Sequence, residues 1–232
     1  MGSLLSRGSR LLREANVTFI ATEPLWLAAT NTYVVAPERG GPAVVIDAPP
    51  EPGRIVDLLA AHDLSPVALL VTHGHVDHAG GAGSLARATG ITVYVHPDDD
   101  FLTLDPTTQL SILFGVVPAG EYDPPERFEA LTGGERLSLA GLEIDVLHTP
   151  GHTPGHCCFH LPAIGTLFSG DQLFAGSIGR VDLPGGSMTE LADSMRNQVM
   201  PLDDGTRVLP GHGPETTIGY ERATNPFRAE WE

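Results

Sequence analysis

The apolar positions of the chain follow the periods of strands and helices in turn. Two apolar, β-branched runs, residues 31–36 and 42–49, flank the turn sequence PERGG and predict a pair of strands. Residues 51–64 carry apolar side chains at helical spacing, and the run 66–72 predicts a buried strand. A glycine-closed helix is predicted over 78–90. The first part of the chain therefore alternates strands with helices.

The regular pattern stops after a strand predicted over 91–96. The stretch 97–136 is less regular, because prolines break any long element in it. These prolines are Pro106, Pro118, Pro124 and Pro125. A lid over a site and a passive surface excursion both fit such a stretch, and the sequence leaves both open.

A second strand-rich half follows the proline-containing stretch. Strands are predicted over 141–149, 156–162, 165–171 and, as the last strand, 206–213. A helix is predicted over 187–202, with Ser187 as its N-cap and Glu190 completing a capping box. Two such halves without a linker predict an α/β fold in which two mixed sheets pack together and helices cover them. Residues 17–232 are expected to form this single domain, after an N-terminal arm of residues 1–16.

The composition narrows the classes of partner. The chain has 13 basic and 29 acidic residues and a net charge of -16, which argues against nucleic acid, because phosphate neutralisation needs basic patches. No apolar run approaches the length of a transmembrane helix, so no membrane partner is expected. Cys157 and Cys158 are adjacent and are not expected to form a disulfide, which fits a reducing compartment and a cytoplasmic location. The oligomeric state is not indicated.

The loop sequence VTHGHVDHAGGAG collects potential metal ligands in a few positions. His73, His75, Asp77 and His78 lie between a buried strand and a glycine cluster. Histidines held close together repel one another when protonated and lose solvation when buried, unless something binds them. The predicted strand before the loop places these residues at its carboxyl end, where open α/β sheets have their sites. The loop therefore predicts part of a metal site.

Three later segments also place a ligand-type residue at the end of a strand beside glycine. They are HTPGHTPGH with His152, FSGDQLF with Asp171, and LPGHGP with His212. Glycine beside a ligand lets the backbone turn sharply and approach an ion closely.

These residues, in this order, resemble the ligands of the metallo-β-lactamase superfamily. The stretches TPGHTPGH, SGDQLF and GHGPETTIGYERATNPF are most similar to its small glyoxalase II-like branch, and the resemblance covers nearly the whole chain. It implies the αβ/βα four-layer sandwich of that superfamily. It also implies that His73, His75 and His152 hold one metal, that Asp77, His78 and His212 hold a second, and that Asp171 bridges the two. Imidazole and carboxylate ligands fit zinc, with iron or manganese as alternatives.

The resemblance implies an enzyme that hydrolyses thioesters such as S-lactoylglutathione, with Asp77 and Asp171 among its catalytic residues. In glyoxalase II-like enzymes a metal-bridging hydroxide attacks the carbonyl and the thiolate leaves. Arg180 stands where the family carries a basic residue that contacts the carboxylate of the thiol. The larger enzymes of the family also have a C-terminal helical segment and a tyrosine that bind glutathione. Here Pro214 stands in place of that tyrosine, so the identity of the thiol that carries the acyl group is left open.

Three other functions remain as alternatives. An iron-dependent persulfide dioxygenase shares the fold and most of the ligands, and GRVDLPGG resembles its corresponding loop. A β-lactamase-like or lactonase-like hydrolase is the second alternative. The third is a non-catalytic metal-binding module, in which loss of one or more ligands is expected, and the chain has all of them.

The remaining histidines and Asp47 have weaker assignments. His148, His156 and His160 are expected to support a ligand or to pack in the core, and His62 and His96 to lie on the surface. Asp47, at the end of AVVID, fits either an acceptor that orients the histidine loop or a simple turn residue.

Overall fold

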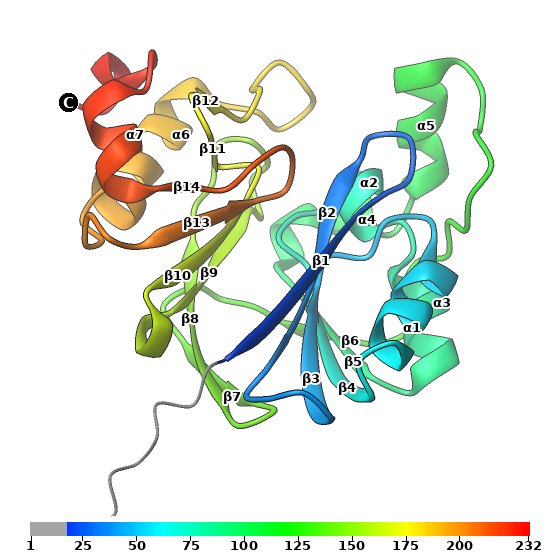
Figure 1. Cartoon of the computed structure of the whole chain (residues 1–232). Coiled ribbons are helices and arrows are strands. Elements are labelled where there is room, and N and C mark those ends of the chain that lie inside the picture. The colour runs from blue at the N-terminus through cyan, green and yellow to red at the C-terminus, as the bar shows by residue number, and fades with distance from the viewer. Residues whose placement is uncertain (1–17) are drawn as a thin grey trace, which may run out of the picture.

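The computed structural model of the chain describes residues 18–232, apart from the side chains of residues 113 and 114. The N-terminal arm expected over residues 1–16 lies outside the described residues. Two six-stranded mixed sheets face each other and carry helices on their outer sides (Figure 1). This arrangement confirms the α/β four-layer sandwich predicted from the sequence.

The first sheet has the strand order β1-β2-β3-β4-β5-β6. Its strands are β1 (Phe19–Leu25), β2 (Thr30–Ala36), β3 (Gly41–Ile46), β4 (Leu64–Leu70), β5 (Thr92–Val95) and β6 (Phe128–Ala130). Strands β1 to β3 pair antiparallel, whereas β3 to β6 pair parallel. The parallel strands are connected through helices α1 (Pro52–Ala60), α2 (Val76–Ala79) and α3 (Ala82–Thr89) and through the segment before β6.

The second sheet has the order β14-β13-β10-β9-β8-β7. Its strands are β7 (Arg136–Leu139), β8 (Leu142–His148), β9 (Cys157–Leu161), β10 (Thr166–Gly170), β13 (Arg207–Pro210) and β14 (Thr216–Thr217). A small hairpin, β11 (Leu173–Phe174) and β12 (Ser177–Ile178), leaves the sheet after β10. Outside the sheet lie α6 (Met188–Ser194), its π-helical continuation η3 (Met195–Val199) and α7 (Ile218–Thr224). Two 3-10 turns, η2 (Pro162–Ile164) and η4 (Arg228–Glu230), complete this half.

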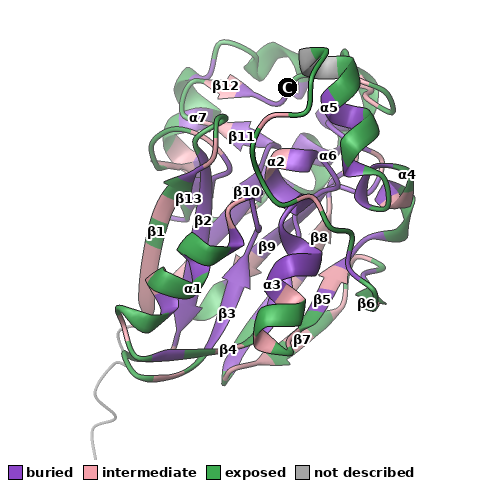
Figure 2. Cartoon of the chain, turned by 90° about the vertical axis from the view of Figure 1, so that its right-hand side faces the viewer, coloured by how far each residue is buried: buried purple, intermediate pink, exposed green. Residues whose placement is uncertain are grey.

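Three apolar layers hold the sandwich together. Tyr33 and Ile46 of the first sheet meet Phe159 and Phe168 of the second, and these side chains form the core between the sheets. Separate clusters lie between each sheet and its outer helices. The inner strands, such as β2 and β10, are consequently buried on both faces while the outer helix faces are exposed (Figure 2), as expected for strands covered on both sides.

Several elements differ from the sequence-based prediction. Strand β1 was not predicted, because its sequence FIATEPL is polar at several positions and contains Pro24, as an edge strand tolerates. The strand predicted as the last, over 206–213, is followed by β14. Ser187 caps α6 by accepting a hydrogen bond from the Glu190 amide, but the Ser187 amide donates to Gly151 O, so the capping box is only half formed.

The stretch 97–136 is more regular than its prolines suggest. It contains η1 (Pro97–Asp99), α4 (Asp100–Thr103) and α5 (Pro106–Phe114) before β6. Pro97 and Pro106 stand in the first turn of their helices, where the missing amide hydrogen costs nothing. No helix among residues 18–232 has the length and apolar character needed to cross a bilayer.

Candidate metal centre

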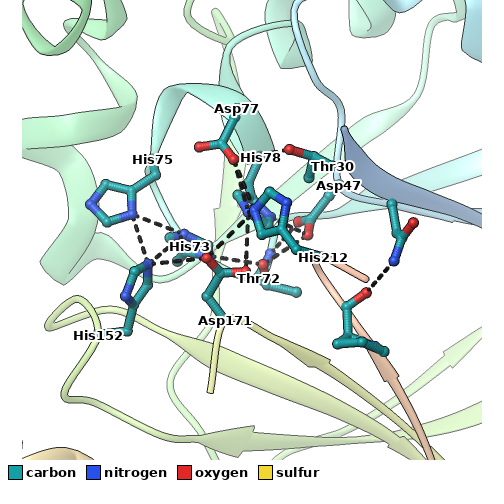
Figure 3. A network of polar contacts seen from close by, with 12 residues as sticks. Thr30, Asp47, Thr72, His73, His75, Asp77, His78, His152, Asp171 and His212 are labelled. Carbon is teal, nitrogen blue, oxygen red and sulfur yellow. Dashed lines mark hydrogen bonds and ion pairs between the residues drawn. The ribbon is translucent and has the colours of Figure 1, made fainter. Parts of the chain in front are cut away.

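The loops that follow β4, β8, β10 and β13 meet at one edge of the two sheets and bring the seven predicted ligands together (Figure 3). His73, His75 and His152 form the first group. Their facing nitrogens are 3.1 Å apart between His73 Nε2 and His75 Nδ1, 2.9 Å between His75 Nδ1 and His152 Nε2, and 3.2 Å between His152 Nε2 and His73 Nε2. A tetrahedral ion with bonds of about 2.0–2.1 Å requires ligand nitrogens about 3.3 Å apart. The three imidazoles therefore fit one metal ion.

Asp77, His78 and His212 form the second group beside the first. His78 Nε2 lies 3.3 Å from both His212 Nε2 and Asp77 Oδ2, and His212 Nε2 lies 3.1 Å from that same oxygen. The Thr30 hydroxyl donates to Asp77 Oδ2 at 2.9 Å and orients the carboxylate. These three atoms fit a second ion with one carboxylate and two imidazole ligands.

The carboxylate of Asp171 faces both groups. Its Oδ1 lies 3.3 Å from His78 Nε2, whereas its Oδ2 lies 3.5 Å from His152 Nε2 and 3.6 Å from His212 Nε2. Oδ1 is buried and accepts no hydrogen bond. A buried carboxylate oxygen without a hydrogen-bond donor is costly unless a cation binds it, so the position of Asp171 fits a bridging ligand.

Two glycines are needed for this approach. Gly170, directly before Asp171, has φ +48°, and a side chain there would collide with His156 Nε2 and Thr72. Gly211, directly before His212, lies so close to Asp171 Oδ1 and His78 Cε1 that a Cβ atom would overlap both. The glycines beside these two ligands therefore provide space as well as a turn.

Asp47 orients two of the histidines, and of its two sequence-based interpretations the structure supports the acceptor. Its Oδ2 accepts from His78 Nδ1 at 2.7 Å and from the Thr72 hydroxyl at 2.9 Å, and its Oδ1 accepts from the Thr72 amide at 2.7 Å. Since the Thr72 hydroxyl donates to Asp47, its oxygen accepts from His73 Nδ1, 3.0 Å away. When either histidine binds metal, Nδ1 carries its proton and Nε2 presents the lone pair to the site.

Asp99 was not expected from the sequence to belong to the site. This fully buried carboxylate accepts hydrogen bonds of 2.7 Å from the Gly74 amide, the Thr153 hydroxyl and the Gly155 amide. It therefore joins the loop of His73 and His75 to the loop of His152. The signal that would have revealed it is weak, because HPDDD offers three similar acids and only one is buried.

Gln109 of α5 is a second residue that sequence analysis missed. Its Oε1 accepts from the Val76 amide at 3.0 Å, and its Nε2 donates to the carbonyls of Gly74 and Leu102. Together with Asp99, it anchors the η1–α5 segment to the ligand loop. Residues 97–114 therefore form a wall beside the ligand loop, which argues against a passive excursion for this part of the stretch 97–136.

The other histidines are arranged around the ligands or away from them. His156 is buried, and its Nε2 accepts from the Asp171 amide at 3.1 Å, so it supports that ligand. The expectation that His96 lies on the surface is wrong: the ring is buried and stacks on His148 with centroids 4.2 Å apart. His160 is half-buried in β9, with its Nδ1 4.0 Å from Asp145 Oδ2 of the neighbouring strand.

The two groups differ in electrostatics. Burial, reinforced by the neighbouring histidines, lowers the pKa of His75 to about 3 and that of His73 well below its usual range. Both imidazoles are therefore neutral near pH 7, the form that binds metal. Burial also acts to lower the pKa of His78, but Asp77 and Asp171 outweigh it and raise this pKa well above its usual range. His78 in the second group therefore carries an extra proton near pH 7 when no metal is bound, and it has to release that proton to bind a metal ion.

A cavity of about 520 Å³ opens onto the ligands. Trp26, Phe174, Ile178 and Leu183 contribute apolar walls, and Arg180 lines it too. The Arg180 guanidinium makes two 2.7 Å contacts with Asp182, while the Arg180 carbonyl accepts from His152 Nδ1 at 2.7 Å. Arg180 is thus beside the site, and its backbone helps to orient a ligand whatever its side chain binds.

Replacing Asp99 should weaken metal binding by the first group of ligands without unfolding the chain. Asp99→Asn places an amide NH₂ against partners that all donate, which costs about 1–3 kcal/mol. We expect Zn²⁺ affinity at the first group, measured by competition with a chelator, to fall about 10- to 100-fold. The exposed neighbour Asp98→Asn is the matched control and should bind Zn²⁺ as the parent does. Equal affinities in the two variants would show that Asp99 does not position the ligands.

The profile of the metallo-beta-lactamase superfamily matches residues 25–212. An uncharacterized protein of Aquifex aeolicus is 40% identical over 89% of this chain and 95% of its own length. The hydroxyacylglutathione hydrolase GloC of Haemophilus influenzae is 37% identical over 80% of this chain and 86% of its own length.

Solved structures agree with the sequence matches. The B3 metallo-beta-lactamase BLEG-1 superposes with a TM-score of 0.82 at 36% identity, over 90% of this chain and 99% of its own. TTHA1623 in a di-iron-bound form gives 0.78 at 40% identity over the same shares. ETHE1 from Myxococcus xanthus gives 0.72 at 26% identity, over 92% of this chain and 88% of its own. With its His and Asp clusters for divalent metal ions, the chain therefore belongs to the metallo-beta-lactamase superfamily.

Proposed function

We propose that this metal-dependent hydrolase cleaves thioesters such as S-lactoylglutathione. The observation that carries the proposal is the presence of two complete ligand groups, with Asp171 facing both, at the floor of one cavity. A two-ion site suits attack on a carbonyl whose oxygen gains negative charge. The similarity to the hydroxyacylglutathione hydrolase GloC supports the thioester among carbonyl substrates.

The proposed reaction consumes one water molecule. The water oxygen forms a bond to the carbonyl carbon, the carbon–sulfur bond breaks, and the thiolate leaves and takes up a proton, which gives a carboxylic acid and a thiol. Two divalent ions would supply Lewis acidity and lower the pKa of water. Asp77 and Asp171 are the proposed catalytic carboxylates, because they would hold these ions beside the carbonyl and offset about two of their four positive charges.

The identity of the metal belongs to the proposal. Imidazole and carboxylate ligands at near-tetrahedral spacing favour zinc, and iron or manganese accept the same atoms. The di-iron form of TTHA1623 supports iron as the main alternative.

Arg180 is proposed to bind the carboxylate of the thiol. It lines the same cavity as the ligands, and a guanidinium recognises a carboxylate through two parallel hydrogen bonds. In the structure Asp182 occupies that position, with the Arg180 side chain 57% exposed. A substrate carboxylate therefore has to displace an exposed ion pair, which costs little.

The wider setting of the reaction is proposed from the charge. The net charge of -16 argues against nucleic acid as a partner, and free Cys157 and Cys158 fit a reducing compartment. The chain is therefore proposed to act on a small-molecule substrate in the cytoplasm, without nucleic acid or a membrane as partner. Two other activities keep specific support: the likeness to BLEG-1 favours β-lactam hydrolysis, and the likeness to ETHE1 keeps the persulfide dioxygenase.

Metal content and activity should be measured on the same sample. Elemental analysis of protein purified without chelator should find close to two metals per chain, and this protein should hydrolyse S-lactoylglutathione. A single iron with oxygen uptake on glutathione persulfide would replace the proposal with the dioxygenase. Faster turnover of a chromogenic cephalosporin than of any thioester would replace it with the β-lactamase.

Single ligand substitutions should separate the metal site from packed histidines. His75→Ala and Asp171→Asn should each lower kcat at least about 100-fold, because each removes an ion or misplaces it. His160→Ala should keep kcat within about twofold, since this half-buried histidine lies next to Asp145 and does not face the ligands. Metal content of each variant is measured alongside. Near-parental turnover of Asp171→Asn would show that the bridging assignment is wrong.

Arg180→Ala should weaken substrate binding more than turnover. The backbone carbonyl that orients His152 is retained, so we expect a KM for S-lactoylglutathione raised about 5- to 20-fold with a smaller change in kcat. A neutral thioester of similar size should show no such increase. Asp182→Asn is the matched control and should lower KM for the anionic substrate, because it frees the guanidinium. Equal losses on the charged and neutral thioesters would assign Arg180 to the fold.

A further inference from the structure

A second, smaller cavity adjoins the metal centre. Its volume is about 130 Å³, and His75 and Leu183 line both this cavity and the larger one. Phe101, Leu102, Ile112, Leu183 and Pro184 form its apolar walls, and we call it the side pocket. Helices α4 and α5, which supply most of these residues, stand at the same end of the molecule as the β11–β12 hairpin (Figure 1). The side pocket is therefore a branch of the substrate cavity at His75.

The polar residues of the side pocket are engaged with the protein itself. Gln109 uses its amide on the backbone of Gly74, Val76 and Leu102. The Thr108 hydroxyl donates to Asp105 Oδ2 at 2.6 Å, and Asp105 caps α5. No arginine is among the described lining residues, and the one charged residue, Asp105, is an acid. The side pocket therefore favours an uncharged, apolar ligand group.

The volume sets the size of that group. A cavity of about 150 Å³ lined by Leu, Ile and Phe is dry and binds benzene. The side pocket is similar in volume and apolar lining but is open to solvent at Phe101 and Ile112, so it suits a phenyl ring or an unbranched chain of about six carbons that enters from the metal cavity.

The positions of Arg180 and the side pocket decide which half of a thioester enters. A thioester has two arms that diverge from the trigonal carbonyl carbon, the acyl chain and the thiol. Arg180 lines the metal cavity but not the side pocket, and it was assigned above to the thiol carboxylate. The arm that extends past His75 is then the acyl group.

We propose that the side pocket binds the acyl group of the substrate, so that the physiological substrates are thioesters of apolar acids of about six carbons rather than of lactate. This inference rests on the proposed thioester hydrolysis and specifies its substrate class. A terminal carboxylate on the acyl chain would face Asp105 without a basic partner, so dicarboxylic acyl groups are excluded.

The test is a series of glutathione thioesters that differ only in the acyl group. Because each buried methylene contributes about fourfold, kcat/KM should rise at least tenfold from acetyl to hexanoyl and fall again at decanoyl. The adipoyl thioester, with six carbons and a terminal carboxylate, should react no faster than the acetyl one. Ile112 is 66% exposed, so Ile112→Trp fills the side pocket without burying a large side chain in the core. This variant should lose the preference for hexanoyl over acetyl.

Leu104→Trp is the matched control. Leu104 lies in the same segment and is 50% exposed but does not line the side pocket, so its variant should keep both the preference and the activity. If all acyl chains were hydrolysed equally, or if Leu104→Trp lost the preference as Ile112→Trp does, the inference would be wrong.

Binding of toluene tests the side pocket without catalysis. Toluene should shift the methyl NMR signals of buried Leu102 in the parent and in Leu104→Trp, and not in Ile112→Trp. Absence of binding in the parent would overturn the side pocket as an apolar site, whether or not thioesters are cleaved. Toluene binding without hydrolysis of any thioester would instead overturn the proposed function, and the acyl assignment with it.

Discussion

Seven side chains that must present lone pairs to metal ions at one point are the constraint around which the structure is organised. Their facing atoms lie between 2.9 and 3.6 Å apart, and in the deprotonated form that binds metal they do not hold one another in place without cations. Hydrogen bonds from behind hold them instead. Asp47 fixes the rings of His73 and His78. Asp99 joins the ligand loop that follows β4 of the first sheet to the ligand loop that follows β8 of the second sheet. The Asn31 amide group donates to the carbonyls of Pro210 and Gly213 on either side of His212, which ties the last ligand to the first sheet.

This organisation explains what the sequence reveals. A ligand at the end of a buried strand needs a tight turn and little space, so each one is marked by glycine, as Gly170 marks Asp171 and Gly211 marks His212. These glycines can be recognised in the local sequence, and they predicted which ligand residues come together. The two-sheet fold was predictable for a similar reason, because the ends of β3 and β4 that are buried on both faces, residues 43–46 and 68–70, read as unbroken apolar runs.

The residues that support the ligands carry no such mark. Asp99 differs from Asp98 and Asp100 only through the depth at which tertiary packing places it, and Gln109 resembles any polar residue of a short helix. His96 is buried through its stack on His148, a contact between two sheets that no local pattern encodes. Strand β1 was missed because an edge strand forms through pairing with β2 and keeps polar side chains.

The dispersal of the ligands along the chain has a consequence during synthesis on the ribosome. The first group is complete in sequence at His152, whereas the second requires His212, about 60 residues later. At about 5–20 residues per second, roughly 3–12 s separate the emergence of the two. During that interval Asp77 and His78 lack His212, the third ligand of their group, and the inner face of the first sheet is not yet covered by β13. A nascent chain that binds its first ion early therefore does so in a half-built protein, whose unpaired apolar face is a target for chaperones.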